Sequence, residues 1–337
     1  MNIKIKSFLV KQPDLNNKTI LVTGGTGSFG NQFVETVIKN YKPKKLIIFS
    51  RDELKQYEMS QKFSPDKYGF MRYFIGDVRD YNRLEMALRG VDIVIHAAAL
   101  KHVPIAEYNP YECIHTNVIG AENIVRASLR NGVKQVLALS TDKAVSPINL
   151  YGASKLAAEK IFMAANNIRG EDPTIFSAVR YGNVVGSRGS VVPFFKKLLN
   201  EGADSLPITD EEMTRFWITL NQGVDFVLSN LALMQGGEIF VPKIPSMKIV
   251  DLAQAIKPGI KTHTIGIRPG EKLHECMLTA DESLNTIETE DRYVLLASFI
   301  KEWNTSVSYK KLEARMVYSS ETNSDWITHE QLKAMIN

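Results

Sequence analysis

The sequence predicts an α/β protein: a doubly wound, parallel Rossmann sheet with a smaller C-terminal α+β region. Three observations support this fold class. Short runs rich in Ile, Leu and Val alternate with amphipathic stretches through the first half of the chain, a glycine-rich segment follows the first of these runs, and prolines become frequent after Val191. Repeated strand–helix units indicate parallel strands with helices on both faces of the sheet.

Five segments are predicted as strands because they are short and apolar, as strands buried on both faces of a sheet are. They are Thr19–Thr23, Lys45–Ser50, Arg72–Gly76, Asp92–His96 and Gln135–Ser140, with helices predicted over Phe29–Asn40, Leu54–Phe63 and Tyr81–Arg89. We expect a cofactor-binding domain over residues 18–190. Residues 191–337 are expected to be mainly substrate-binding and to cover the strand ends, with some strands and helices returning to the sheet.

Composition excludes several classes of protein. The 337 residues include 41 basic and 37 acidic side chains, an excess too small to indicate nucleic-acid binding. Cys113 and Cys276 belong to no Cys/His cluster, so we expect no metal site and no disulfide framework, and a reducing cytoplasm is favoured. The apolar patch Phe8–Val10 is too short for a signal peptide, and no apolar run has the roughly 20 residues that a membrane span needs.

The glycine-rich segment reads Gly-Gly-Thr-Gly-Ser-Phe-Gly from Gly24 to Gly30, directly after the first predicted strand. Gly24 allows a tight turn, Gly27 lets a pyrophosphate approach the backbone, and Gly30 lets the following helix pack on the sheet. A strand before the loop and a helix after it are the context that such a motif requires. The predicted cofactor residues here are Gly24, Thr26, Gly27, Ser28, Phe29 and Gly30.

The end of the second predicted strand favours NADP over NAD. Where an acidic residue usually holds the ribose 2′-hydroxyl of NAD, the chain has Ser50, Arg51 and Lys55, which can surround a 2′-phosphate. Alternatively, Arg51 and Lys55 are only solvated charges in the first turn of a helix. The predicted cofactor segment also includes Asp52, Glu53 and Leu54, of which the two acids are better explained as helix N-terminal charges.

Two further strand ends carry candidate cofactor contacts. Asp77 and Val78 follow the third strand, and the Asp77 carboxylate is placed to accept a hydrogen bond from an adenine amino group. Ala97 and Ala98 follow the fourth strand, where small side chains leave room for a flat cofactor, although an alanine run is also typical of tight packing.

Tyr151 and Lys155 are four residues apart at the start of a helical pattern that covers Ala153–Ala165, so they share one helix face. An ammonium near a phenol favours the phenolate, which can take a hydroxyl proton while hydride leaves the same carbon. Their position after a fifth strand, downstream of the glycine loop, favours this function over a chance surface pair.

Asp142 and Lys143 suggest a second acid/base pair, because a plain dehydrogenase or 4-epimerase needs only the hydride apparatus. Once a sugar carbon is oxidised to a ketone, the neighbouring C–H becomes acidic. A neutral Lys143 can remove that proton, and a protonated Asp142 can donate to a departing hydroxyl; both roles need shifted pKa values. A loop ion pair or a helix cap would explain the same two residues without any catalytic role.

With these motifs in place, the chain resembles the inverting UDP-N-acetylglucosamine 4,6-dehydratases, members of the extended short-chain dehydrogenase/reductases. These enzymes open the pseudaminic acid pathway that feeds flagellin glycosylation. The resemblance runs from about Lys18 to the C-terminus. Its most specific stretches are Ser50–Lys55, Phe74–Arg79, Ala97–Pro104, Ser140–Ala144, Arg180–Phe195, Met213–Thr219 and Ile265–Glu275.

The resemblance implies roles for individual residues. Lys143 would be the base at C5, Asp142 the acid at the C6 hydroxyl, and Tyr151 with Lys155 the hydride-step pair. Thr141 would hold the C4 oxygen, and Lys101 would face both cofactor and substrate. The substrate contacts would be Asn183 on the sugar nucleotide, Arg268 and Glu271 on the uridine diphosphate, and Arg188 and Arg215 as further diphosphate candidates.

The implied reaction is redox-neutral: oxidation at C4, loss of water across C5–C6, return of hydride to C6, and protonation of C5 from the opposite face. The product would be UDP-2-acetamido-2,6-dideoxy-beta-L-arabino-hex-4-ulose. The family forms homo-oligomers, often hexamers. The capsule-forming 4,6-dehydratase/3,5-epimerases share several motifs but lack the tyrosine at position 151. The motifs also leave open a UDP-sugar 4-epimerase and a non-catalytic NADP-binding protein.

Overall fold

The computed structural model describes residues 7–8, 11–187 and 189–336 and confirms the predicted fold class. In the described residues, the main sheet has ten strands with the order β16-β14-β15-β10-β6-β5-β4-β1-β2-β3, and the seven from β10 to β3 are parallel. The parallel strands are β1 (Thr19–Thr23), β2 (Lys45–Ser50), β3 (Met71–Ile75), β4 (Ile93–His96), β5 (Gln135–Leu139), β6 (Ile175–Val179) and β10 (Glu238–Pro242). Three antiparallel strands extend one edge: β15 (Arg292–Leu296), β14 (Thr286–Glu288) and β16 (Lys310–Lys311).

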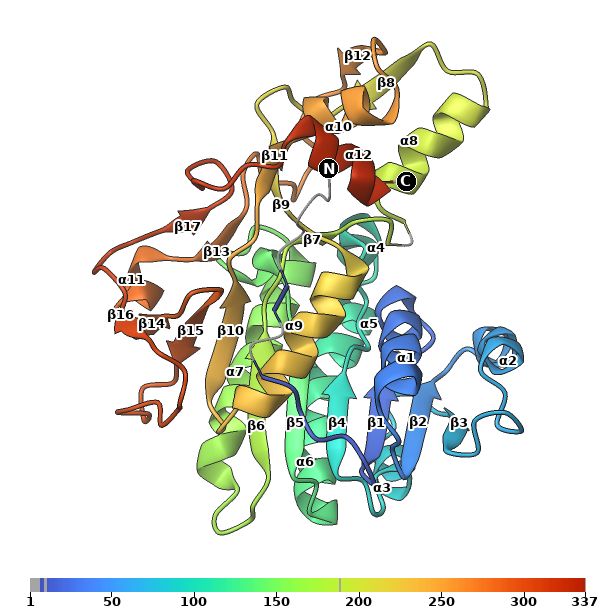
Figure 1. The fold of residues 1–337 in the computed structure, drawn as a ribbon, viewed down its shortest axis with the longest axis vertical. Helices are drawn as coiled ribbons and strands as arrows, with labels where there is room; N and C mark the ends of the chain where they lie inside the picture. The colour runs from blue at the N-terminus through green and yellow to red at the C-terminus, as the bar shows by residue number, and fades with distance from the viewer. Residues whose placement is uncertain (1–6, 9–10, 188, 337) are drawn as a thin grey trace.

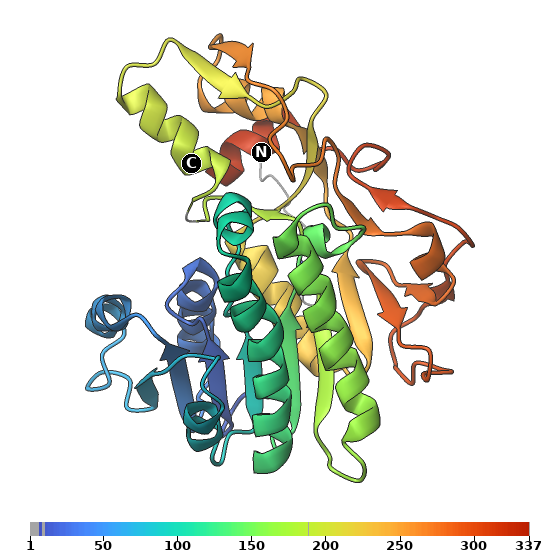
Figure 2. The same cartoon turned by 180° about the vertical axis from the view of Figure 1, so that it is seen from behind.

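Helices cover both faces of the sheet (Figures 1 and 2). On one face α1 (Ser28–Asn40) packs beside α9 (Leu220–Leu233), and on the other α6 (Gly120–Asn131) lies between α3 (Tyr81–Ala87) and α7 (Leu150–Ile168). Each helix layer forms a separate apolar core with the sheet face beneath it. The remaining helices of this half are α2 (Glu53–Lys62), α4 (Val103–Tyr108), α5 (Pro110–Ile114), the π-helix η1 (His115–Ile119) and the 3-10 helix η2 (Asp142–Ala144).

The predicted strands and helices of the first half are all present, with their ends displaced by a few residues at most. The third strand stops at Ile75 rather than Gly76, where a side chain would meet the Phe49 ring at 2.4 Å. The helix predicted over Ala153–Ala165 is longer, because the Asn149 side chain accepts from the Gly152 amide and caps a first turn that begins at Leu150.

Residues after Val191 build a smaller layer above the carboxyl ends of the parallel strands (Figure 1). Its core is formed mainly by α8 (Val191–Asn200), α10 (Ile249–Ile256), α12 (His329–Ile336) and β8 (Ser205–Ile208), which pairs with β12 (Lys261–Thr264). A second small sheet consists of β7 (Asn183–Val184), β9 (Thr214–Ile218) and β11 (Ser246–Lys248). A third consists of β13 (Cys276–Leu278) and β17 (Tyr318–Ser319), and α11 (Ala280–Ser283) follows β13. The same part of the chain returns to the main sheet through α9, β10 and β14–β16.

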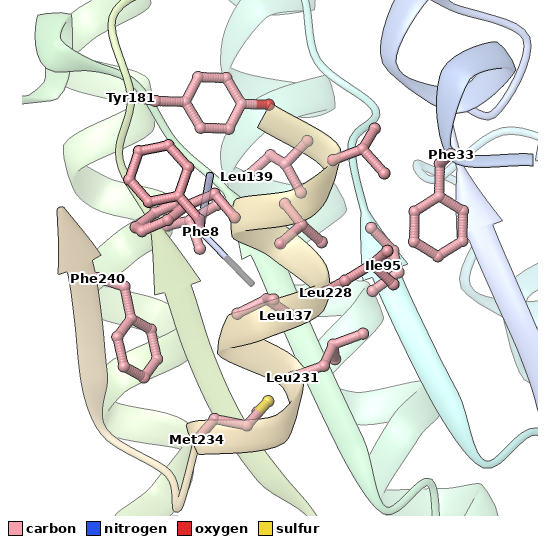
Figure 3. Packing of buried hydrophobic residues seen from close by; sticks show 14 of the residues in the cluster. Phe8, Phe33, Ile95, Leu137, Leu139, Tyr181, Leu228, Leu231, Met234 and Phe240 are labelled. Atoms are coloured by element: carbon pink, nitrogen blue, oxygen red, sulfur yellow. The ribbon is translucent and has the colours of Figure 1, made fainter. Parts of the chain in front are cut away.

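Near the N-terminus, the described residue Phe8 packs against the main body. The Phe8 ring is fully buried and meets Phe226 of α9 edge-on at 5.0 Å. Figure 3 shows Phe8 with Leu137, Leu139 and Phe240, in the core between α9 and the sheet. Among the described helices, none is both long and apolar enough to cross a membrane.

Candidate active site

A cleft of about 1320 Å³ separates the main sheet from the smaller layer. It opens at the carboxyl ends of β1 and β4, where the strand order reverses and where ligands of doubly wound sheets bind. The lining includes every predicted strand end and parts of the segments 182–187, 189–195 and 265–275. The fold therefore brings together motifs that are up to about 250 residues apart in the chain.

The glycine loop has the geometry that its sequence predicts. Gly24 adopts φ +62°, and a side chain there would come within 2.8 Å of the Ala98 backbone, so only glycine fits. At Gly30 a Cβ would lie 2.0 Å from the Gly25 carbonyl oxygen, which shows how tightly α1 sits on the loop. Thr26, Ser28 and Phe29 also line the cleft, and α1 begins at Ser28, so the helix end that favours anions lies at this loop.

The end of β2 presents a hydroxyl and two cations to the same cleft. Ser50 accepts a hydrogen bond from Thr26 at 3.1 Å, and Arg51 and Lys55 line the opening. Arg51 lies 3.7 Å from Asp77, and Lys55 lies 2.6 Å from Asp52. Asp52 is the N-cap of α2, as its sequence position predicts, while Leu54 is 65% exposed on that helix.

The Asp77 carboxylate makes hydrogen bonds within the protein that the sequence does not predict. Its carboxylate accepts from the Arg79 amide and from two nitrogens of the Arg79 guanidinium, at 2.7–3.0 Å. Burial opposes ionisation, but these hydrogen bonds and the two nearby arginines hold the pKa of Asp77 below its usual range. The carboxylate lines the cleft beside Val78, so an adenine contact at this position stays a prediction.

The end of β4 is held by Thr23 and His96. The Thr23 hydroxyl accepts from the amides of Ala97 and Ala98 at 3.2 Å and lies 2.9 Å from His96 Nδ1. Burial and the nearby Lys155 lower the pKa of His96 to about 3, so this ring is neutral at physiological pH. These bonds fix the flat alanine surface against which Gly24 packs.

Tyr151 and Lys155 both line the cleft from the first turns of α7. Burial raises the pKa of Tyr151 to about 12, opposed by the Lys143 ammonium and the Thr141 hydroxyl. Burial lowers the pKa of Lys155 to about 8, opposed by Glu159 one turn further along. The ammonium that most lowers the pKa of the phenol is therefore that of Lys143, where the sequence suggested Lys155.

Gly152 sets how closely α7 approaches the Asp142–Lys143 pair. A side chain on Gly152 would lie 2.1 Å from the Lys143 carbonyl oxygen. The start of α7 consequently touches η2, and Tyr151 stands beside Thr141 and Lys143. Deeper in the same helix, Glu159 pairs with Arg180 at 2.7 Å, and Arg180 also binds Glu282 at 2.8 Å, so α7 is tied to the C-terminal region.

Lys143 lies at the centre of a charged group. Its Nζ atom is 3.1 Å from Asp142 Oδ1, 3.0 Å from Glu275 Oε1 and 3.5 Å from Asn183 Oδ1. Thr141 donates to the same Asp142 oxygen at 2.9 Å. Burial lowers the pKa of Lys143, but the two carboxylates outweigh burial and raise it, so the resting side chain is an ammonium. Asp142 and Lys143 thus do form an ion pair, in which Lys143 lines the cleft and Asp142 is fully buried beneath it.

The predicted substrate residues also meet here, with one exception. Lys101, Asn183, Arg215, Arg268 and Glu271 line the cleft, while Arg188 lies outside the described residues. Burial lowers the pKa of Lys101. Arg268 makes a two-pronged pair with Glu271 at 3.0 and 3.1 Å. Arg215 is buried, and its guanidinium donates to the carbonyls of Thr214, Leu273 and Lys272, so it braces the segment that carries Glu271.

Two residues of the site were not predicted from the sequence. Glu275 reaches Lys143 from just before β13, and Asn117 in η1 donates to Ser154 of α7 and exchanges two hydrogen bonds with the Leu100 backbone. Asn117 thereby positions the loop that carries Lys101. An amide in a helical segment gives no sequence signal of its own, but a π-helical turn is frequent at functional sites.

A family model described as polysaccharide biosynthesis protein matches residues 20–297. The chain belongs to this family. Over 330 residues it is 58% identical to the UDP-N-acetylglucosamine 4,6-dehydratase (inverting) of Campylobacter jejuni, covering 96% of this chain and 98% of that protein. It is 46% identical to the UDP-glucose 4-epimerase of Rickettsia bellii, covering 79% of each. The resemblance inferred from the motifs is confirmed.

Solved structures support the same placement. Pen from Bacillus thuringiensis superposes with a TM-score of 0.87 at 37% identity, covering 96% of this chain and 98% of Pen. DesIV, a dTDP-glucose 4,6-dehydratase from Streptomyces venezuelae solved with NAD bound, superposes with a TM-score of 0.68 at 23% identity over 76% of this chain and 86% of DesIV. The latter likeness bears on the fold alone.

Proposed function

We propose that this protein is a C5-inverting UDP-N-acetylglucosamine 4,6-dehydratase, a hydro-lyase that works with tightly bound NADP. One observation carries the proposal. Tyr151, Lys155 and Lys143 line one cleft beside the glycine loop, with Asp142 paired to Lys143 beneath it, in a chain 58% identical to an inverting dehydratase along nearly its whole length. A non-catalytic NADP-binding protein has no use for both pairs.

NADP fits the residues present. Gly24 and Gly27 of the glycine loop line the cleft without side chains, so a pyrophosphate can approach their backbone, and the 2′-phosphate would be held by Ser50, Arg51 and Lys55 at the end of β2. When bound, the nicotinamide supplies the hydride acceptor and donor. The buried Lys155 would hold the ribose end and the Tyr151 phenol in one orientation.

The protein's own groups supply the proton transfers. Tyr151 acts as a phenolate, a state that the nearby Lys143 ammonium and a bound oxidised nicotinamide would favour, and takes the C4 hydroxyl proton, with the Thr141 hydroxyl beside the C4 oxygen. Lys143 removes the acidified C5 proton, and Asp142, which lies beneath Lys143 and not in the cleft lining, would relay a proton toward the departing C6 hydroxyl. The uridine diphosphate and the sugar are held by Arg268, Glu271, Arg215, Asn183 and Lys101, and Arg188 belongs to the same proposal.

A UDP-sugar 4-epimerase is the second candidate, favoured by the Rickettsia relatives. It would use Tyr151 and Lys155 in the same way but would not need the carboxylates that surround Lys143. The dehydratase relative is both more similar and matched over more of the chain, 96% against 79%.

The test is the product formed from UDP-N-acetylglucosamine in deuterated water. We expect a 4-keto sugar one water lighter than the substrate, with deuterium at C5 and inverted configuration there by NMR. Lys143→Ala should lower turnover by about 10²- to 10⁴-fold, because it removes a general base, yet retain the cofactor. A product of unchanged mass would indicate the epimerase, and unchanged turnover in Lys143→Ala would contradict the base assignment.

We also propose a homo-oligomer, a hexamer by family resemblance, working in the cytoplasm. Ile105, Tyr108, Tyr111 and Ile114 on α4 and α5 are 41–87% exposed, a cluster of apolar side chains of the kind that subunit contacts cover. Both cysteines are free, as is usual in reducing compartments. Sedimentation of the purified protein measures the assembly.

A further inference from the structure

Three acceptors surround the Lys143 ammonium: Asp142 Oδ1, Glu275 Oε1 and Asn183 Oδ1, at 3.0–3.5 Å. An ammonium has three donor hydrogens, so this arrangement satisfies all of them. A base at C5 must instead be a neutral amine with a free lone pair. The proton on Lys143 therefore needs a place to go before Lys143 can act.

The two carboxylates beside Lys143 differ in their surroundings. Asp142 Oδ1 already accepts from Thr141 as well as from Lys143, and the Asp142 side chain lies beneath these two cleft-lining residues, 1% exposed. Glu275 is itself a cleft-lining residue, although only 2% exposed.

Each carboxylate also has a second oxygen, Asp142 Oδ2 and Glu275 Oε2, that is buried without a hydrogen-bond partner among the described residues. Ionisation of a buried carboxylate costs free energy when one of its oxygens has no hydrogen-bond donor. Such an oxygen is therefore well suited to carry a proton. Only Glu275 combines such an oxygen with a place in the cleft lining, where a proton can be passed on to the substrate.

Glu275 is held in this place by its neighbours in the chain and in space. Its backbone amide donates to the Ser320 hydroxyl at 2.9 Å, and Ser320 is bonded in turn to Thr214 of β9 at 2.7 Å. The Arg215 guanidinium lies 3.9 Å from Glu275 Oε1. The backbone of Glu275 is thus anchored to β9, and its carboxylate stays beside Lys143.

We infer that Glu275 is a positioning residue for Lys143 and stores the proton that Lys143 must release before it takes one from the sugar. The inference rests on the proposed function. The Lys143 N–H bond breaks and an O–H bond forms on Glu275, which leaves an amine beside a carboxylic acid and no net charge on the pair. The amine then takes the C5 proton as the C5–H bond breaks, and Lys143 is again an ammonium.

The proton stored on Glu275 is then transferred to the leaving group. When the C6–O bond breaks, the leaving hydroxide needs a proton to become water. Transfer from Glu275, directly or through Asp142, returns the pair to its resting charges. The charged and titratable groups that face Lys143 from the packed elements are Asp142, Glu275, Arg215 and Tyr151. Of these, Glu275 alone combines contact with Lys143, a place in the cleft lining and a buried oxygen without a partner.

The test is Glu275→Gln in the full-length protein, loaded with cofactor. The amide keeps the shape and the hydrogen bond to Lys143 but cannot take its proton. We expect the single-turnover rise of reduced nicotinamide to stay within about threefold of wild type, while elimination slows by about 100-fold, so that reduced cofactor accumulates. Turnover of the Glu275→Gln variant should also rise steeply with pH, because Lys143 must now lose its proton to solvent.

Glu321→Gln is the matched control. Glu321 pairs with His274, the neighbour of Glu275, and is 49% exposed, so this variant should keep wild-type kinetics and pH profile. If Glu275→Gln does not fold, Glu275→Asp retains a proton-accepting carboxylate and should slow elimination more than C4 oxidation.

Equal slowing of both steps in these variants, or an unchanged pH profile and rate in Glu275→Gln, would overturn the inference. Failure of the proposed function looks different: the wild-type protein would then form no dehydrated product at all.

Discussion

Arg51 lies at the carboxyl end of β2 with 57% of its side chain exposed, 3.7 Å from Asp77. An exposed pair of this kind contributes at most about 1 kcal/mol to stability, so it does not explain the position of the residue. A charge-assisted hydrogen bond to a phosphate contributes more, about 1.5–3 kcal/mol. On these magnitudes, we expect cofactor choice rather than folding to depend on Arg51.

Arg51→Ser should therefore weaken NADP binding by about 10- to 100-fold and leave NAD binding nearly unchanged. Titration of the cofactor-free protein with each dinucleotide measures both affinities. Lys62→Ser, which removes an exposed cation at the other end of α2, is the control. Equal losses for the two dinucleotides would instead mean that Arg51 supports the loop as a whole, and NADP preference would lose its main support.

At the scale of elements, the sequence predicts those strands and helices that a local residue pattern encodes. Strands β1–β5 are apolar runs in a parallel sheet, and the spacing of Tyr151 and Lys155 on one helix is enough to place both at the cleft. The edge strands β14 and β16 have three and two residues, and no periodicity can be recognised in so few. Glu275 could not be predicted for a related reason: it lies in a connecting segment, and its partner Lys143 is brought to it only by the tertiary fold.

The contact between α7 and η2 is the element-level feature that positions the Tyr151–Lys155 pair relative to the Asp142–Lys143 pair. Gly152→Ala would place a methyl group 2.1 Å from the Lys143 carbonyl oxygen. Because this oxygen belongs to the backbone, the clash can be relieved only if the backbone moves. We expect α7 to shift outward, with a loss of about 1–3 kcal/mol in stability and a larger loss of turnover than of cofactor affinity.

Thermal unfolding and steady-state kinetics measure both effects of this substitution. Gly69→Ala is the control, because nothing lies within 4 Å of a side chain at that position. Wild-type turnover in Gly152→Ala would mean that the close approach of α7 to η2 is not needed for the reaction.

At the scale of the whole molecule, the N-terminal segment connects two halves of the main sheet. The Phe8 ring packs on Phe226 of α9, and the Phe8 carbonyl accepts from Arg292 of β15 at 3.3 Å. Further along, Asn16 and Asn17 bind the backbone of Lys42, which follows α1. The described residues of this segment thus contact both the antiparallel edge strands and the loop after α1, and the buried Phe8 and Leu15 side chains give the segment a structural role.

Phe8→Ala should lower the free energy of unfolding by about 3–5 kcal/mol, because it empties a fully buried ring site between α9 and the sheet (Figure 3). The melting temperature should fall by roughly 5–10 °C. Turnover well below that temperature should persist, since Phe8 contributes no side chain to the cleft lining. Lys11→Ala, on an exposed position of the same segment, should change the melting temperature little. An equal melting temperature for both variants would show that the core between α9 and the sheet closes without Phe8, and that the segment is not what joins the two halves.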